Sequence, residues 1–230
     1  MGEVLAVVPA RGGSVGIPRK SIVPVAGRPM LAWTAEAALG AGSLDRVVLS
    51  TDDEEMAGIG ADLGLEVPFL RPAALAGDTV PMADVLAHAL GWATGAGIDV
   101  DVVVLLQPTS PLRRSEHIDG AVARLADPTV DTVVTVVPVP HQFNPVSVMR
   151  RDADGTLGPY QDGPLVTRRQ DKPEVWARNG PAVVATRARL VAAGEVYGGR
   201  MVGHEMSPLD SIDVDGPDDL VLVDLLLRQR

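Results

Sequence analysis

Apolar runs alternate with helical patterns along the first 140 residues of this 230-residue chain. Four runs are nearly continuous in valine and leucine, as parallel strands covered on both faces are. They are Val4–Pro9, Arg46–Ser50, Val102–Gln107 and Thr132–Val137. The helical patterns cover Met30–Leu39, Glu54–Leu63, Met82–Thr94 and Ser115–Leu125. This alternation predicts an α/β fold with a doubly wound, mostly parallel sheet. Ligands of such sheets bind beyond the carboxyl ends of the strands, so functional residues are expected in the loops that follow them.

A proline-rich segment from Pro138 to about Asn179 interrupts the alternation. Its prolines separate short extended pieces, and Asp154-Gly155 predicts a hairpin turn. A piece of this size could hardly bury a core of its own. We therefore predict one domain over residues 1–230, with residues 138–180 as an inserted arm that packs on a second copy of the chain in a homodimer. After the arm, the sequence predicts a strand from Pro181, a short helix and a final helix over Pro217–Leu227.

The composition narrows the choice of partners. The net charge is −10, which argues against nucleic acid and against an anionic membrane surface. The absence of cysteine excludes disulfides, thiolate metal sites and cysteine nucleophiles. The apolar runs are too short for a membrane span or a signal peptide, so we expect a cytoplasmic protein.

A glycine-rich loop with three cations follows the first predicted strand, in the sequence VVPARGGSVGIPRK of residues 7–20. Glycines let backbone N–H groups approach a polyphosphate, and the cations Arg11, Arg19 and Lys20 would neutralise its charge. Lys20 is one of two lysines among 20 basic residues, which suits a point-charge contact with phosphate. The spacing fits neither the dinucleotide-binding fingerprint nor the P-loop. The alternative is an ordinary solvated basic turn.

Two carboxylates near the end of the chain suit a metal site. Asp213 and Asp215 are two residues apart in a segment that reads as extended, so their side chains share one face. Such a pair beside a cationic loop suits Mg²⁺ that bridges protein and phosphate oxygens. The alternative is an acidic turn that caps the last helix, a role for which Asp218 and Asp219 are better placed.

Other predicted strands also end in polar loops. The block LQPTSPLR of residues 106–113 offers an amide, two hydroxyls and a guanidinium, held by two prolines. The acids of Ser50–Asp53 would either face this edge or cap the following helix. Arg71 lies in a loop beside them, whereas Arg168 and Arg169 lie in the arm, where plain surface charge is an equal alternative.

Eight motifs resemble, in order and spacing, those of the acylneuraminate cytidylyltransferases, the CMP-sialic acid synthetases and their close relatives. These motifs are PARGGSxGIPRK, GRPM, LSTDD, FLRP, LLQPTSPLR, RRQ-x-x-P, NG and SIDVD-x-x-x-DL. The resemblance runs from about Leu5 to Leu220, and its most specific blocks are LQPTSPLR and SIDVD. It implies a nucleotidyltransferase-type fold. It also implies an enzyme that transfers CMP from CTP to a hydroxyl of a 2-ulosonic acid and releases pyrophosphate, with Mg²⁺ and without a covalent enzyme intermediate.

The resemblance also assigns roles by position. Arg11, Lys20, Asp213 and Asp215 would be catalytic, and the two aspartates would hold Mg²⁺, one of them also accepting the proton of the attacking hydroxyl. CTP would lie on Ala10, Arg11, Gly12, Gly13, Ser14, Lys20 and Arg71. The small acidic acceptor would lie on Gln107, Thr109, Ser110, Arg168, Arg169 and Asn179. The arm would form the dimer and in part complete the neighbour's site.

Four departures from the family pattern leave the substrate open. Val15 stands where lysine is usual and Ser21 where asparagine is usual. Pro81-Met82 replaces a small hydroxyl residue near the base, and Pro181–Val184 lacks the usual aromatic group. The acceptor could therefore be sialic acid, another nonulosonic acid, a deoxy-octulosonate or a phosphonate. Two further alternatives are a nucleotidyltransferase that uses another nucleoside triphosphate and a nucleotide-binding module without catalysis.

Overall fold

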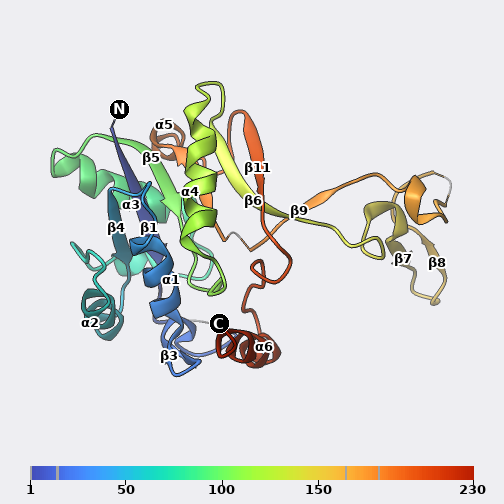
Figure 1. Cartoon of the computed structure of the whole chain (residues 1–230), viewed down its shortest axis with the longest axis horizontal. Coiled ribbons are helices and arrows are strands. Elements are labelled where there is room, and N and C mark those ends of the chain that lie inside the picture. The colour runs from blue at the N-terminus through green and yellow to red at the C-terminus, as the bar shows by residue number, and fades with distance from the viewer. Residues whose placement is uncertain (1, 14–15, 164, 181) are drawn as a thin grey trace.

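A seven-stranded sheet forms the centre of the computed structural model, which describes residues 2–13, 16–163, 165–180 and 182–230. Its strands are β1 (Glu3–Pro9), β4 (Arg46–Ser50), β5 (Val100–Leu105), β6 (Thr132–Pro138), β9 (Trp176–Arg178), β10 (Val184–Arg187) and β11 (Met201–Glu205). The order is β11-β6-β10-β5-β1-β4, and β9 pairs with β6 (Figure 1). The pairings make β4, β1, β5, β6 and β11 point the same way, whereas β10 and β9 run against them. The predicted α/β fold with a mostly parallel sheet is confirmed.

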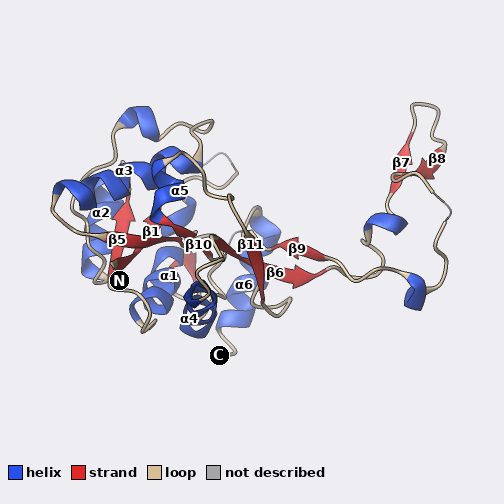
Figure 2. Ribbon diagram, turned by 90° about the horizontal axis from the view of Figure 1, so that it is seen from above, coloured by secondary structure: helices blue, strands red, loops and turns tan. Residues whose placement is uncertain are grey.

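Helices cover both faces of the sheet (Figure 2). They are α1 (Met30–Leu39), α2 (Glu54–Asp62), α3 (Met82–Gly95), α4 (Ser115–Ala123), α5 (Ala188–Ala192) and α6 (Pro217–Leu227). Alternate residues of β1 feed two cores: Ala6 and Val8 pack with α1, α2 and α4, and Leu5 and Val7 pack with α3 and α5. This double burial explains why the strand reads as a continuous apolar run. A third apolar cluster joins α6 to the small hairpin of β2 (Pro24–Val25) and β3 (Arg28–Pro29).

The predicted elements of the first 140 residues are all present, with small shifts at their ends. The largest shift is in β5, which ends at Leu105 and leaves Gln107 in the loop beyond the strand. The strand expected from Pro181 begins at Val184, and Pro181 itself is outside the described residues. It runs antiparallel between β5 and β6. The edge strand β11, which pairs with β6, has no counterpart among the predicted elements.

The segment predicted as an arm leaves the sheet at the end of β6 and returns through β9, where Pro138 pairs with Trp176. Between them lies a hairpin of β7 (Met149–Arg151) and β8 (Leu157–Pro159), whose turn contains Gly155 at φ +89°. Figures 1 and 2 show this hairpin well away from the sheet. Large apolar side chains are exposed along the arm: Phe143, Val148, Met149, Leu157, Tyr160, Leu165 and Trp176.

Among the helices that the structure describes, none combines the length and the apolar character that a membrane crossing requires.

Candidate active site

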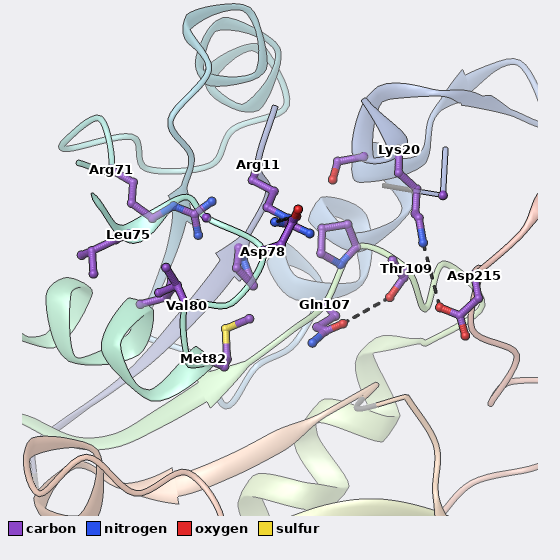
Figure 3. A pocket seen from close by; sticks show the side chains of 16 residues that line it. Arg11, Lys20, Arg71, Leu75, Asp78, Val80, Met82, Gln107, Thr109 and Asp215 are labelled. Carbon is purple, nitrogen blue, oxygen red and sulfur yellow. Dashed lines mark hydrogen bonds and ion pairs between the residues drawn. The ribbon is translucent and has the colours of Figure 1, made fainter. Parts of the chain in front are cut away.

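A cavity of about 440 Å³ opens beyond the carboxyl ends of β1 and β5 (Figure 3). Three cations line it: Arg11 and Lys20 from the two ends of the glycine-rich loop, and Arg71 from the loop that precedes α3. Leu75, Val80, Met82 and Val85 form an apolar wall, and Gln107, Thr109 and Asp215 line the opposite side. The structure thus gathers residues from the start, middle and end of the chain at the sheet edge where a doubly wound fold binds ligands.

The backbone of Val214 joins the glycine-rich loop to the C-terminal acids. Its N–H donates to the carbonyl of Thr109 at 2.7 Å, and its carbonyl accepts from Lys20 Nζ at 2.8 Å. The same Nζ lies 4.0 Å from Asp215 Oδ1, as the dashed line in Figure 3 marks. An ammonium group has three donors, so Lys20 keeps donors for a ligand in the cavity. Lys20 and Asp215, 195 positions apart in the chain, therefore present opposite charges to one space.

Asp213 and Asp215 differ in their surroundings. The side chain of Asp215 is 86% exposed and lines the cavity. Asp213 is half-buried and accepts a hydrogen bond from Ser110 Oγ at 3.1 Å. Burial raises the pKa of Asp213, hydrogen bonds from Thr109 and Ser110 oppose that rise, and the charge of Asp215 adds to it.

These two carboxylates fit a Mg²⁺ ion that keeps water and phosphate ligands. In the parts of the chain that the structure describes, no cluster of three or more histidine, aspartate or glutamate side chains could hold a metal. Mg²⁺ is commonly held by one or two carboxylates together with substrate phosphates and water, so a larger cage is not needed. Of the two, Asp215 lines the cavity in which phosphates would lie, whereas Asp213 lies against Ser110 and is not among the lining residues.

Arg71 is a buried guanidinium at the other end of the cavity. Its side chain is 3% exposed and lies 3.5 Å from Asp52 Oδ1, which also accepts the N–H of Gly12 at 3.2 Å. Burial lowers the pKa of Arg71, and Asp52 opposes that shift. Nε and Nη2 of Arg71 have no hydrogen-bond partner among the described residues, and Nη2 is the nitrogen that lies nearest Asp52. Buried donors of this kind are costly unless they are satisfied.

Arg11 forms an ion pair with Asp78 across the cavity. Asp78 is a site residue that the sequence analysis missed. It stands alone between Gly77 and Thr79, and nothing in that loop distinguishes it from an ordinary surface acid. For Asp52, the sequence leaves two alternatives open, a place at this edge of the sheet or a cap of the following helix, and does not indicate its partners. Its contacts with Gly12 and Arg71 depend on two loops that are distant in the chain.

Three residues of the glycine-rich loop make contacts with other parts of the chain. Arg19 adopts a left-handed backbone conformation and donates to Asp53 at 2.9 and 2.8 Å and to Glu55 at 2.7 Å, so it faces α2. Ala10 is buried and its N–H donates to Ser50, while the N–H of Gly12 is taken by Asp52. Gly13 is exposed and a side chain there would meet nothing within 4 Å. Ser14 and Val15 lie outside the described residues.

The residues predicted to hold the acceptor fall into three groups. Gln107 and Thr109 line the cavity and are joined by a hydrogen bond of 3.3 Å. Ser110 and Asn179 are buried behind them, and Asn179 Nδ2 donates to Ser211 Oγ at 2.8 Å. Arg168 and Arg169 are exposed on the arm, and the structure does not bring them to the cavity of their own chain (Figure 1).

Comparisons with known proteins identify the family of this chain. A family model described as cytidylyltransferase matches residues 5–175. A CMP-N,N'-diacetyllegionaminic acid synthase of Legionella pneumophila is 32% identical over 98% of this chain and 97% of its own length. An N-acylneuraminate cytidylyltransferase of Escherichia coli is 29% identical over 99% of this chain, which spans about half (52%) of that protein.

Solved structures share the fold at lower identity. A CMP:2-keto-3-deoxy-manno-octonic acid synthetase complexed with CTP superposes with a TM-score of 0.73 at 18% identity, over 99% of both chains. A 4-diphosphocytidyl-2C-methyl-D-erythritol synthase gives a TM-score of 0.69 at 15% identity, again over 99% of both chains. The family model and the Legionella relative each cover most of the chain, so this protein is an enzyme of the cytidylyltransferase family.

Proposed function

We propose that this enzyme transfers CMP from CTP to a hydroxyl of a 2-ulosonic acid of the sialic acid type and releases pyrophosphate, with Mg²⁺. The observation that carries the proposal is the approach of Lys20 to Asp215 at a cavity that Arg11 and Arg71 also line. A cation from the glycine-rich loop and an acid from the end of the chain suit the two sides of one magnesium–triphosphate. The names of the Legionella and E. coli relatives support an acceptor of the nonulosonic class.

The nucleotide would lie across the cavity with its base towards Arg71. The apolar wall of Leu75, Val80 and Met82 suits the face of a pyrimidine ring, and the guanidinium of Arg71, which also lines the cavity, suits the acceptor atoms of its edge or of the ribose. Arg11 and Lys20 would neutralise the triphosphate and then the departing pyrophosphate. Asp78 pairs with Arg11 in the free enzyme, so we expect CTP to displace its carboxylate.

In the transfer, the acceptor hydroxyl oxygen forms a bond with the α-phosphorus, and the bond from that phosphorus to the pyrophosphate oxygen breaks. Asp213 and Asp215 would hold Mg²⁺, which when bound offsets the charge of the phosphate oxygens. Asp213 is the better placed of the two to accept the hydroxyl proton, because burial raises its pKa and it lies against the acceptor side at Ser110. The chain otherwise contributes positioning and charge neutralisation.

The acceptor carboxylate needs a cation of its own, because the three cations that line the cavity, Arg11, Lys20 and Arg71, are assigned to the nucleotide. Arg168 and Arg169 are exposed on the arm, which also carries exposed apolar side chains such as Phe143 and Tyr160. We propose that the arm packs on a second copy in a homodimer and that its arginines reach the partner's acceptor site. A cytoplasmic location would give this dimer access to nucleoside triphosphates.

Pyrophosphate release tests the proposal. Purified enzyme with CTP and Mg²⁺ should release pyrophosphate with at least one member of a panel of nonulosonic acids, deoxy-octulosonate and phosphonates. Mass spectrometry should find a product equal to the acceptor plus CMP. Parallel reactions with UTP, GTP and ATP should be much slower. Release with another triphosphate alone would contradict the base assignment. CTP binding without product from any acceptor would indicate a nucleotide-binding module instead.

A further inference from the structure

Arg113 is a buried cation behind the acceptor side of the cavity. It closes the LQPTSPLR block but does not line the cavity, and it is 2% exposed. None of the ion pairs among the described residues involves it. Burial lowers the pKa of Arg113 to about 9, a shift that the negative charge of Asp213 partly opposes. Burying a guanidinium without an ion pair costs free energy, so we expect Arg113 to have a specific role.

One nitrogen of Arg113 joins two separate segments of the chain. Nη1 donates to the carbonyl of Gln107 at 3.0 Å and to the carbonyl of Ala182 at 2.8 Å. Gln107 is the cavity residue that follows β5, whereas Ala182 lies between the arm and β10. Because hydrogen bonds from a charged donor are stronger than neutral ones, this nitrogen fixes the separation of the two segments.

The segment that contains Ala182 lies beside Asp213. The N–H of Ala182 donates to the carbonyl of Asn179 at 2.9 Å, which closes a turn. Gly180, at φ +97° in that turn, is so close to Asp213 that a Cβ would lie 3.1 Å from Asp213 Cγ. The arm rejoins the sheet just before the turn, through the pairing of Arg178 with Val136. Arg113 therefore fixes the position of Gln107 relative to the segment beside Asp213, and with it the point at which the arm rejoins the sheet.

The nucleotide end of the cavity depends on other contacts. Arg71 and Gly12 meet at Asp52, Arg11 pairs with Asp78, and Lys20 bonds to Val214. No hydrogen bond of Arg113 reaches any of these residues. Loss of the Arg113 side chain should accordingly disturb one end of the cavity and spare the other.

We infer that Arg113 is a positioning residue for the acceptor, acting through Gln107 and through Ala182, whose segment lies beside Asp213. The position of the acceptor at this end of the cavity rests on the proposed function. The effect of Arg113 on this end rests on the two hydrogen bonds of its Nη1. The inference predicts that acceptor binding depends on Arg113 and that CTP binding does not.

Steady-state kinetics test this with Arg113→Met, Arg113→Lys and a matched control. The control is Arg187→Met, because Arg187 also donates to backbone carbonyls, those of Leu125 and Val130, but does not line the cavity. With the panel acceptor of highest turnover, Arg113→Met should raise KM for the acceptor about ten-fold or more, the effect of losing charge-assisted bonds. KM for CTP should change less than about two-fold, and Arg113→Lys, which keeps a cationic donor, should recover part of the loss. Equal increases in both KM values, or constants matching those of Arg187→Met, would overturn the inference.

Amide hydrogen exchange provides a readout that needs no turnover. In the free enzyme, Arg113→Met should speed exchange in residues 107–110 and 182–184 and leave residues 5–12 as in the wild type. Arg187→Met should not speed exchange in either acceptor-side segment. Unchanged exchange there in Arg113→Met would refute the positioning role. Wild-type enzyme that turns over no panel acceptor, with exchange altered as expected, would reject the proposed acceptor class and keep the role of Arg113.

Discussion

At the scale of single residues, the site depends on close approaches that only certain side chains permit. Gly180 has φ +97°, a backbone conformation that side chains with a Cβ rarely adopt, and it lies against Asp213. Lys20 is 15% exposed yet keeps its ammonium group between Val214 and Asp215. At such positions the backbone lies directly against a charged side chain. A small substitution there should therefore move that side chain and affect activity as well as stability.

Gly180→Ala should lower both stability and turnover. The left-handed backbone should cost more than about 1 kcal/mol with alanine, and the added Cβ should displace Asp213. Gly194→Ala is the matched control, because Gly194 has φ +82° and a Cβ there would meet nothing within 4 Å. Thermal unfolding should show similar losses for both variants, whereas kcat should fall only in Gly180→Ala. Equal kcat values in the two variants would show that Asp213 tolerates the displacement.

At the scale of elements, the glycine-rich loop is anchored to the start of α2. Asp53 accepts two hydrogen bonds from Arg19 and also caps α2 by accepting the N–H of Met56 at 3.0 Å. Arg19 has φ 53°, a conformation that a non-glycine residue keeps only where its surroundings hold it. The position of Lys20, the next residue, depends on this anchor.

Asp53→Ala and Asp53→Asn separate the two roles of Asp53. Alanine removes the helix cap, which should cost about 1 kcal/mol of stability, whereas asparagine keeps a capping oxygen. Both remove the charge that holds Arg19, so CTP should bind more weakly to both, by several-fold. Calorimetric titration with CTP and urea unfolding measure the two effects. Wild-type CTP affinity in Asp53→Asn would show that the loop needs no anchor at α2.

Element order was predictable from the sequence because strands buried on both faces and helices with one apolar face leave different patterns. β1 and β4 were predicted almost to the residue. The direction of β10 was not predictable, because a buried strand of Val184–Arg187 reads the same in either orientation. β11 was missed because its exposure alternates at the sheet edge and its length is five residues.

The candidate site was predictable only in part. Three of the predicted site residues belong to recognisable motifs and line the cavity: Lys20, Gln107 and Asp215. The sequence placed Arg19 among the phosphate contacts, but its partners Asp53 and Glu55 lie on a helix more than 30 positions away. Nothing local to Arg19 reveals that contact.

At the scale of the whole molecule, the arm is the segment whose apolar side chains find no packing partner among the described residues of the same chain. It extends from the ends of β6 and β9 and exposes six large apolar side chains between Phe143 and Leu165. Arg168 and Arg169, which lie on it, do not line the cavity of their own chain. The homodimer and the shared acceptor site stay predictions, and they can be tested by removing the arm.

Replacing residues 140–174 with a two-residue Asn-Gly turn should give a monomer. Val139 already donates its N–H to Val175, so the ends of β6 and β9 are close enough for a hairpin turn. Light scattering should give twice 24.0 kDa for the full chain and a single-chain mass for the shortened one. The shortened protein should bind CTP yet lose turnover. Arg168→Ala with Arg169→Ala should lose turnover as a dimer. A shortened chain that still dimerises would place the interface elsewhere.

The most direct test of the account is the effect of Mg²⁺ on the dissociation constant of CTP, measured by calorimetry. In the wild type, Mg²⁺ should tighten CTP binding, because Asp215 lines the cavity beside Lys20 and the charges of both residues act on Asp213. In the double variant Asp213→Asn, Asp215→Asn, the tightening should disappear. In Lys20→Met, CTP should bind about 10- to 100-fold more weakly with or without the metal, as expected for a lost charge-assisted contact. An undiminished Mg²⁺ effect in the double aspartate variant, with normal CTP binding by Lys20→Met, would contradict the proposed magnesium–triphosphate site.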